Sequence, residues 1–409
     1  MRLKIIGALS VLALSASAAL MQDATVVPAD VLTAPFPEVV VYEPETGALY
    51  NVTAEGTQSG ANMSDVAAAA GQAAYNYILS PDRARLAFLM NNADNTISTY
   101  YIADVATGAC CTMLDPQDPA MKSAFDAMFS PDGTQLAVGH YSTQFGPGEM
   151  TPGQIVVYDL ATGSVVARLD SSRIDNSVYG GSPSIGIMIH EWTDAGLIVS
   201  PTCVGCEPPL EGMAQLWNPV DDSLSAANVP FNLTSQKLVN GESLHAVMDP
   251  TFPNNPDAVG MLPIPNVVTY TPASTDPTVP APSQVVYFNP SNIYIRQTSW
   301  VADGQAILIM HADTADFFAP SDEATLLLRD GTQVPLTLPI TRQFLAPTSD
   351  GWVMLDTETK TYVYYRLSGA TVEEIALDAT YTGYPVVVET PAFGNSVVPG
   401  SVFPIVTAP

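Results

Sequence analysis

The chain has 409 residues, of which 47% are hydrophobic and 13% are charged, with 41 acidic residues against 13 basic ones. The net charge of −28 argues against nucleic acid as a partner, because such binding relies on Lys and Arg side chains that neutralise phosphates. Anionic lipid surfaces are disfavoured for the same reason. The acidity fits either solubility in an exposed setting or a surface that takes cations or a cationic partner.

The first 18 residues have the pattern of a secretory signal peptide. Two basic residues precede a short apolar run, Ile5–Leu14, and small residues at A-x-A spacing end at Ala18, where we expect cleavage. The apolar run is too short to span a bilayer, which needs about 20 apolar residues. An uncleaved anchor is the alternative, since weakly apolar residues continue to Met21. The sequence therefore predicts a periplasmic or secreted protein, with no integral membrane segment after cleavage.

Residues 19–37 are expected to form a lead-in segment, and residues 38–409 a single domain built of β-strands. The 35 prolines and 27 glycines indicate many turns, and the only helical candidate is the Ala-rich stretch Ser64–Ala74. One phrase, a hydrophobic strand, a tight turn and a second hydrophobic strand, recurs along the chain. Its copies are Tyr77–Met90, Ala127–Tyr141, Glu191–Ser200 and Trp300–His311.

A second hairpin phrase alternates with the first. Its seven copies are Glu38–Thr53, Thr99–Leu114, Gln154–Leu169, Met213–Val229, Gln284–Thr298, Ala324–Leu338 and Tyr362–Leu377. Together the two phrases give four strands per unit, and the turns of the first five copies are 55 to 71 residues apart. Four-stranded units at such a period are typical of β-propeller blades, which bury their faces against each other.

The two ends of the domain predict how the ring of blades closes. The chain begins with a hairpin, Glu38–Thr53, that lacks an inner partner, and it ends with Gly383–Thr390 and Ser401–Thr407, which lack an outer one. Two strands from each end would complete a seventh blade and remove two exposed sheet edges. The sequence therefore predicts an all-β, seven-bladed propeller whose last blade is closed by both termini.

The pattern of Ser130–Val138 followed by Ile155–Leu169 resembles the extracytoplasmic WD-repeat-like propellers of bacteria, including the TolB-like group. The resemblance covers essentially the whole mature chain and implies the propeller fold. It implies little about activity, because S-P-D-G and D-x-x-T-G are structural turns. The chain has no separate N-terminal domain of the TolB-like kind, so no role in that system is implied.

Signatures of enzymes that use propellers do not match this sequence. Gly180–Gly186 lacks the G-x-S-x-G spacing of a serine hydrolase, and Cys203–Glu207 ends in Glu where covalent haem attachment needs His. The adjacent pair Cys110–Cys111 resembles that of quinone-dependent dehydrogenases, but the four tryptophans share no register with their docking motifs. We therefore expect no catalytic residue and no cofactor, with an enzyme or redox protein that uses the central channel as the alternative.

The cysteines of an exported protein meet an oxidising compartment, where disulfides form. A local bond between Cys203 and Cys206 is the expected pairing, and a zinc site is its rival, although two further ligands are not evident nearby. The acidic clusters Asn91–Asn95 and His311–Asp316 could coordinate calcium, but they lack the spacing of a calcium loop, and solvated turns are the default. We expect no metal.

The long connections between the second and third strands of the blades should gather on one face. They are His140–Gly153, Pro201–Gly212, Pro263–Ser283 and His311–Glu323. Candidate binding residues on this face are two histidines at strand ends and five aromatic residues: His140, His311, Tyr141, Phe145, Tyr270, Phe317 and Phe318. These rings could instead pin their own loops. The sequence predicts a non-enzymatic module that binds a protein or other extracytoplasmic ligand through this face.

Overall fold

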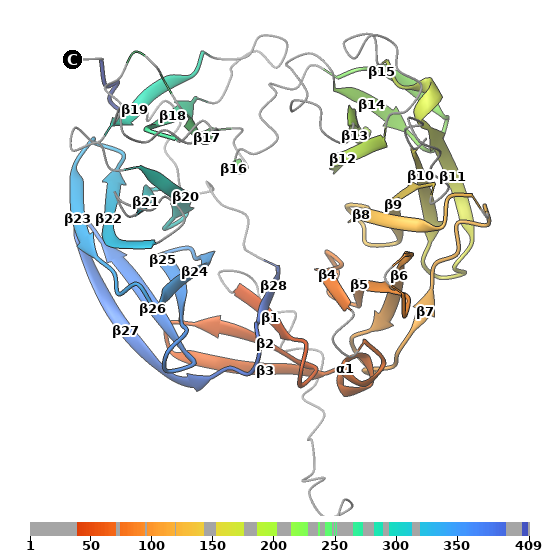
Figure 1. Ribbon diagram of the computed structural model, residues 1–409, viewed down its shortest axis with the longest axis horizontal. Helices are drawn as coiled ribbons and strands as arrows, with labels where there is room; N and C mark the ends of the chain where they lie inside the picture. Colours follow the sequence, from red (N-terminus) through yellow and green to blue (C-terminus); the bar gives the residue numbers. More distant parts are fainter. Residues whose placement is uncertain are drawn as a thin grey trace, which may run out of the picture.

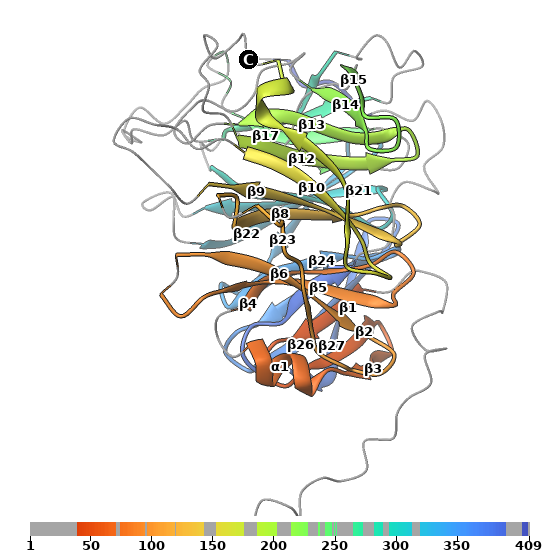
Figure 2. The ribbon, with the colours of Figure 1, turned by 90° about the vertical axis from the view of Figure 1, so that its right-hand side faces the viewer.

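The fold is defined by a computed structural model. The residues that it describes are 39–70, 74–94, 96–118, 120–142, 153–175, 186–202, 214–227, 236–237, 242–247, 249, 251, 265–272, 282–288, 294–312, 320–389 and 403–407. Within these ranges the strands form seven four-stranded antiparallel sheets, which are arranged around a common axis as the blades of a β-propeller (Figure 1). Seen edge-on, the strands run along that axis, so their ends lie on two opposite faces of the ring (Figure 2).

Six sheets take their strands in chain order, with the first strand innermost and the fourth outermost (Figure 1). The first is β4 (Ala74–Leu79), β5 (Arg85–Asn91), β6 (Ser98–Asp104) and β7 (Thr112–Met113). The second is β8 (Ser123–Phe129), β9 (Gln135–Tyr141), β10 (Gly153–Asp159) and β11 (Val165–Asp170). The third is β12 (Gly186–Thr193), β13 (Gly196–Thr202), β14 (Gln215–Asn218) and β15 (Ser223–Ala226).

The next three sheets follow the same scheme. The fourth is β16 (Gln236–Lys237), β17 (Ser243–Val247), β18 (Val267–Thr271) and β19 (Gln284–Phe288). The fifth is β20 (Ile295–Val301), β21 (Ala306–Ala312), β22 (Pro320–Leu328) and β23 (Gln333–Thr337). The sixth is β24 (Arg342–Pro347), β25 (Gly351–Asp356), β26 (Thr361–Ser368) and β27 (Thr371–Thr380). The short helix α1 (Ser64–Ala70) lies within the predicted Ala-rich stretch.

The seventh sheet draws strands from both ends of the described chain, but not in the predicted proportion. Its order is β28 (Val386–Glu389), β1 (Val39–Glu43), β2 (Ala48–Thr53) and β3 (Gly56–Asn62). The predicted two-plus-two division is therefore wrong, because three strands come from the N-terminal side and one from the C-terminal side. The sequence Gly56–Asn62 gave no strand signal, since it is the outermost strand and carries mostly exposed, small and polar residues.

Residues 403–407 do not join this sheet. The backbone N–H of Val406 donates to the carbonyl of Val285 in β19, 2.8 Å away. The Phe403 ring is buried against Tyr270 and Trp300, with ring centroids 5.2 and 6.0 Å away. The C-terminal segment therefore covers the fourth and fifth sheets, where the sequence had predicted an inner strand of the seventh.

Two further strand assignments need correction. Gln284–Thr298 is not one hairpin, because β19 ends the fourth sheet at Phe288 and β20 begins the fifth at Ile295. The stretch Pro263–Ser283 is not one loop, because it contains β18. In both places flanking prolines and asparagines imitate turn signals and hide the true strand boundaries.

The repeated turns owe their shape to local hydrogen bonds. In the S-P-D-G turn, Ser130 Oγ donates to Asp132 Oδ1 at 2.6 Å, the backbone N–H of Thr134 donates to the same oxygen at 3.0 Å, and Gly133 has φ +70°. In the D-x-x-T-G turn, Asp159 Oδ1 accepts from both the backbone N–H and the hydroxyl of Thr162, at 2.8 and 2.7 Å. These bonds explain why the same residues recur at each tight turn.

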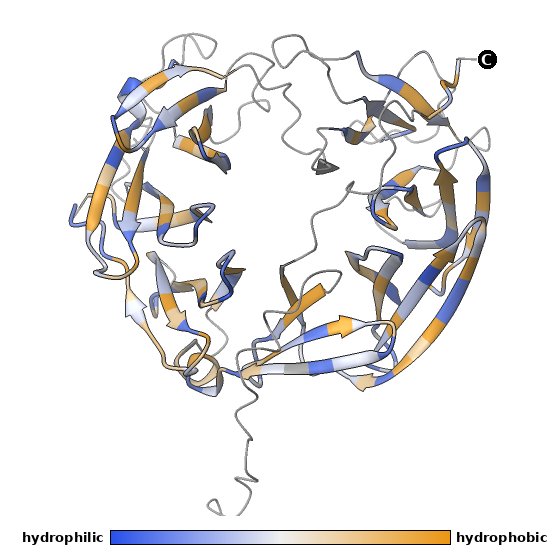
Figure 3. Cartoon of the chain, turned by 180° about the vertical axis from the view of Figure 1, so that it is seen from behind, coloured by the Kyte–Doolittle hydropathy of each residue, from blue (hydrophilic) through white to orange (hydrophobic). Residues whose placement is uncertain are grey.

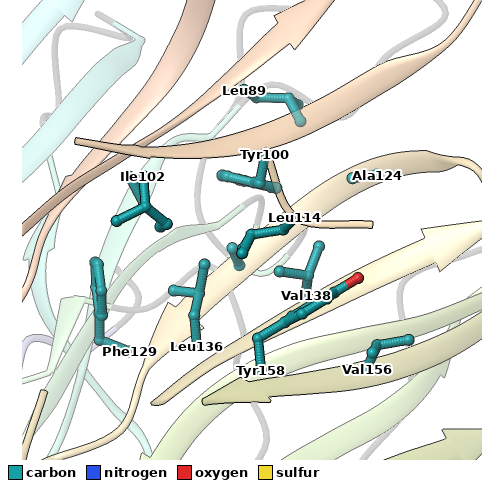
Figure 4. Packing of buried hydrophobic residues seen from close by; sticks show 12 residues of the cluster. Leu89, Tyr100, Ile102, Leu114, Ala124, Phe129, Leu136, Val138, Val156 and Tyr158 are labelled. Carbon is teal, nitrogen blue, oxygen red and sulfur yellow. The ribbon is translucent and has the colours of Figure 1, made fainter. Parts of the chain in front are cut away.

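The core consists of layers between neighbouring sheets. In the part of the chain that the structure describes, six apolar clusters each join residues of two adjacent sheets. Figure 4 shows the layer between the first two sheets, where Tyr100 and Ile102 of β6 face Leu136 and Val138 of β9. Apolar residues are accordingly spread along the strands of every sheet (Figure 3), because each sheet is buried on both faces.

We predict that the buried side chain of Phe403 stabilises the packing of the fourth and fifth sheets. Phe403→Ala should lower the free energy of unfolding by about 3 kcal/mol, as expected for a buried Phe truncation. Deletion of residues 385–409 should cost more, because it also removes β28 from the seventh sheet. Differential scanning calorimetry of both variants checks the order. Equal melting temperatures for the deletion and the intact chain would contradict a stabilising role for β28.

Candidate functional site

His140 and His311 occupy equivalent positions in the second and fifth sheets, and both are buried. His140 Nε2 lies 3.0 Å from the Tyr158 hydroxyl, and His311 Nε2 lies 3.2 Å from the hydroxyls of Tyr287 and Thr325. Burial lowers the pKa of each imidazole to about 4. With side chains only 1% and 2% exposed, these histidines do not present a surface to a partner, contrary to their assignment from the sequence.

Tyr270 is also buried, so the prediction that its ring is exposed in a loop is wrong. It lies in β18, between Trp300 and Phe403, and its hydroxyl donates to Glu242 Oε1 at 2.8 Å. The Arg329 guanidinium lies over the Trp300 and Phe403 rings, and its Nη1 donates to Glu242 Oε1 at 3.2 Å. Tyr270 therefore belongs to a buried ionic cluster that joins the fourth and fifth sheets to the C-terminal segment.

Tyr141, at the end of β9, remains partly exposed. Its ring packs against Phe125 of β8, with 5.9 Å between the ring centroids. The Phe125 ring lies directly over Gly139, where an added Cβ would come within 2.9 Å of it. The absence of a side chain at Gly139 therefore leaves room for the Phe125–Tyr141 pair at the inner edge of the second sheet. Of these two residues, the sequence analysis had named only Tyr141.

Phe145, Phe317 and Phe318 lie outside the described residues, as do Cys203 and Cys206. Their proposed roles stay predictions. The Sγ atoms of Cys110 and Cys111 are in direct contact, and both side chains pack against the core cluster between the seventh and first sheets.

The innermost strands share an irregularity that the sequence did not reveal. In six of the seven sheets, the register between the innermost strand and its neighbour shifts once, as at a β-bulge. In β8 the extra residue is Phe125, and in β20 it is Arg296. These two positions are equivalent, since each follows a residue paired with His140 or His311. Bulges redirect side chains and are common beside functional sites.

Four residues near these two bulges make up what we call the axial site: Lys122, Phe125, Tyr141 and Arg296. Lys122 is exposed and directly precedes Ser123, which pairs with Tyr141. Arg296 is exposed near the start of β20, on the opposite side of the ring from β8 (Figure 1). All four residues therefore lie at the face where innermost strands begin and second strands end.

Next to Phe125, Asp126 is a carboxylate with an unusual environment. Its Oδ2 accepts a hydrogen bond of 3.4 Å from the backbone N–H of Ile189 in β12, which belongs to the neighbouring sheet. Burial raises the pKa of this carboxyl to about 6, and the backbone hydrogen bonds only partly oppose the increase. Asp126 is therefore a group at the inner wall of the ring that can gain or lose a proton near neutral pH.

The described residues contain no group of three His, Cys, Asp or Glu side chains suited to hold a metal ion. Across these same ranges, no helix has the length and apolar character needed to cross a membrane.

Comparison with known proteins gives likeness at the level of the fold. No family model matches the sequence, and no curated protein matches it. The propeller domain of the Trilobed protease from Pyrococcus furiosus aligns with 12% identity and a TM-score of 0.36, covering 89% of this chain and 100% of that one. An oligogalacturonate lyase from Vibrio parahaemolyticus aligns with 9% identity and a TM-score of 0.39, covering 83% and 91%.

A third similar structure is the acylaminoacyl peptidase of Pyrococcus horikoshii, with 11% identity and a TM-score of 0.39 over 82% of this chain. The alignment spans 48% of the length of that peptidase. The sheets themselves define this chain as an all-β propeller protein. Similarities at this level carry no activity over to it.

We predict that Asp126 lowers stability at neutral pH. Its folded pKa is raised, so the neutral acid favours folding at low pH, and this advantage is lost as pH rises through about 6. Asp126→Asn should therefore raise the free energy of unfolding by about 2 kcal/mol at pH 7.5 and change it little at pH 3.5. Urea unfolding at the two pH values measures the effect. A variant less stable than the parent at pH 7.5 would refute this assignment.

Proposed function

We propose that the protein is an exported binding module whose ligand contacts the axial site. The main support is the pair of partly exposed rings, Phe125 and Tyr141, which pack over Gly139 at the inner edge of the second sheet. Aromatic side chains that are already fixed in position lose little conformational entropy when a ligand packs on them. An exposed cation, Lys122, directly precedes Ser123, the residue that pairs with Tyr141.

The position of the axial site fits this function. Strands on either side of the rings are hydrogen-bonded over most of their length, so the site rests on regular structure. The long connection after Tyr141 begins at the same face, as do the connections after β13 and β21. The ends of β9, β13 and β21 thus lie at the face that the sequence analysis proposed for binding.

Export is part of the proposal and rests on the N-terminal pattern that ends at Ala18. N-terminal sequencing of the protein recovered from the extracytoplasmic fraction tests it. A mature chain that begins at Ala19 supports export with cleavage, and full-length protein in the cytoplasm contradicts export.

Replacing both rings tests the binding role. Phe125→Leu with Tyr141→Leu keeps apolar bulk over Gly139 but removes the flat surfaces, so ligand binding should fall at least about tenfold while the melting temperature changes by only a few degrees. A thermal-shift screen of small organic compounds against the parent and variant measures this, because a bound ligand stabilises the folded state.

The matched control is Tyr384→Ala, which removes a ring that is 69% exposed and lies outside the axial site. It should leave every stabilising compound effective. If the compounds that stabilise the parent stabilise the double variant equally, the axial site does not bind them.

A second function, an enzyme that uses the axis, is favoured by Asp126. A buried carboxylate with a pKa near 6 is suited to proton transfer near neutral pH. If a compound from the screen is consumed by the parent protein, the rate should rise as pH passes through about 6, and Asp126→Asn should abolish turnover while retaining binding. Binding without turnover at any pH leaves the module as a binding protein.

A further inference from the structure

We propose, resting on the axial site as the ligand site, that the ligand is an organic anion carrying a carboxylate next to a flat apolar surface. The observation behind this inference is the distribution of positive charge. The chain has only 13 basic residues among 41 acidic ones, so the location of each free cation is informative.

Nearly all described basic side chains are engaged elsewhere. Arg329 binds Glu242, Arg342 Nε lies 3.0 Å from Asp356 Oδ2, and Arg173 Nη1 lies 2.6 Å from Asp222 Oδ1. The remaining engaged side chains bind other carboxylates, backbone carbonyls, or rings, as Lys360 does with Nζ 5.4 Å from the Tyr381 ring centre. These cations therefore stabilise the blades and are not available to a ligand.

Lys122 and Arg296 are the exceptions within the described part of the chain. Both side chains are exposed, and neither makes a hydrogen bond, an ion pair or a ring contact there. Both lie at the start of an innermost strand, and all innermost strands begin at the same face of the ring. The two strands, β8 and β20, belong to sheets on opposite sides of the ring. Two uncommitted cations at one end of the axis of an acidic protein mark the place where an anion is favoured.

The rings beside Lys122 determine the second feature of the ligand. The Phe125–Tyr141 pair offers partly exposed apolar surface to a flat group, and Lys122 precedes the residue paired with Tyr141. A molecule with a carboxylate attached to an unsaturated or aromatic ring can pack on the rings and accept a charge-assisted hydrogen bond from Lys122 at once. Arg296 lies at the same face of the ring and favours the same sign of charge.

Asp126 limits which ligands fit. It follows Phe125 in β8 and carries negative charge above pH 6. Its carboxylate accepts the Ile189 hydrogen bond across the seam with β12, and Lys122 precedes the start of β8. A ligand with one negative charge is therefore attracted by Lys122. A ligand that carries several negative charges along the axis would be repelled by Asp126.

The test compares 2-naphthoate with 2-naphthamide, which has the same rings without the charge. Ligand-observed NMR titration measures both dissociation constants for the mature protein at low and high salt. We expect the carboxylate to bind about tenfold more tightly than the amide at low salt, equivalent to about 1.4 kcal/mol, with the difference shrinking as salt screens the charges. The double variant Lys122→Gln and Arg296→Gln should bind both compounds with the affinity of the amide.

The matched control is Arg173→Gln with Lys360→Gln, which makes the same change in net charge away from the axis and should keep the carboxylate preference. Equal binding of both compounds by the parent, lost in the Phe125→Leu and Tyr141→Leu variant, would overturn the anion inference but retain the axial site. Loss of the preference in the control would also overturn the inference, because net charge would then be its cause. Binding of neither compound would overturn both proposals.

Discussion

The pairing of β28 with β1 is the contact on which the arrangement of the other sheets depends. Val386 and Val387 pair with Tyr42 and Val41, so strands more than 300 residues apart share one sheet. Glu43, at the end of β1, reinforces this junction, because its buried carboxylate accepts from the hydroxyls of Tyr50 at 2.6 Å and Thr382 at 3.0 Å. The buried Glu43 carboxylate is thus hydrogen-bonded at the pairing of β1 with β28, and these bonds offset the cost of burying it.

A second buried carboxylate, that of Glu242, lies between the fourth and fifth sheets and is also hydrogen-bonded. Glu242 accepts from Tyr270 and binds Arg329, whose guanidinium is covered by Trp300 and Phe403. Breaking such a pair costs more than forming it contributes, because one charge is left alone in an apolar layer. The Glu242–Arg329 pair therefore stabilises the fourth and fifth sheets only while both stay packed, and Phe403 of the C-terminal segment covers its guanidinium.

The sequence predicted the number of blades because turn residues with the same hydrogen bonds recur along it, as Ser130 and Asp132 show. The prediction of individual strands failed where these turn residues are absent, or where similar residues occur outside a turn. The strand β3 was missed because it is an outer strand and is polar. The strand β18 was predicted to be a loop because its flanks are rich in proline, and its buried residue Tyr270 was therefore predicted to be exposed. Phe125 was missed because a bulge is a shift of register, and an alternating pattern carries no sign of it.

The axial site combines unpaired cations with partly exposed aromatic rings. Elsewhere in the described chain, buried carboxylates such as Glu43 and Glu242 have full sets of donors, and cations have partners. The register shifts recur in six sheets and so belong to the fold, but at the inner strands burial raises the pKa of Asp126 without a counter-charge, and Lys122 and Arg296 are unpaired. Natural sequences are mostly locally consistent, so two unpaired cations at the same face of the ring support the proposal that a ligand binds there.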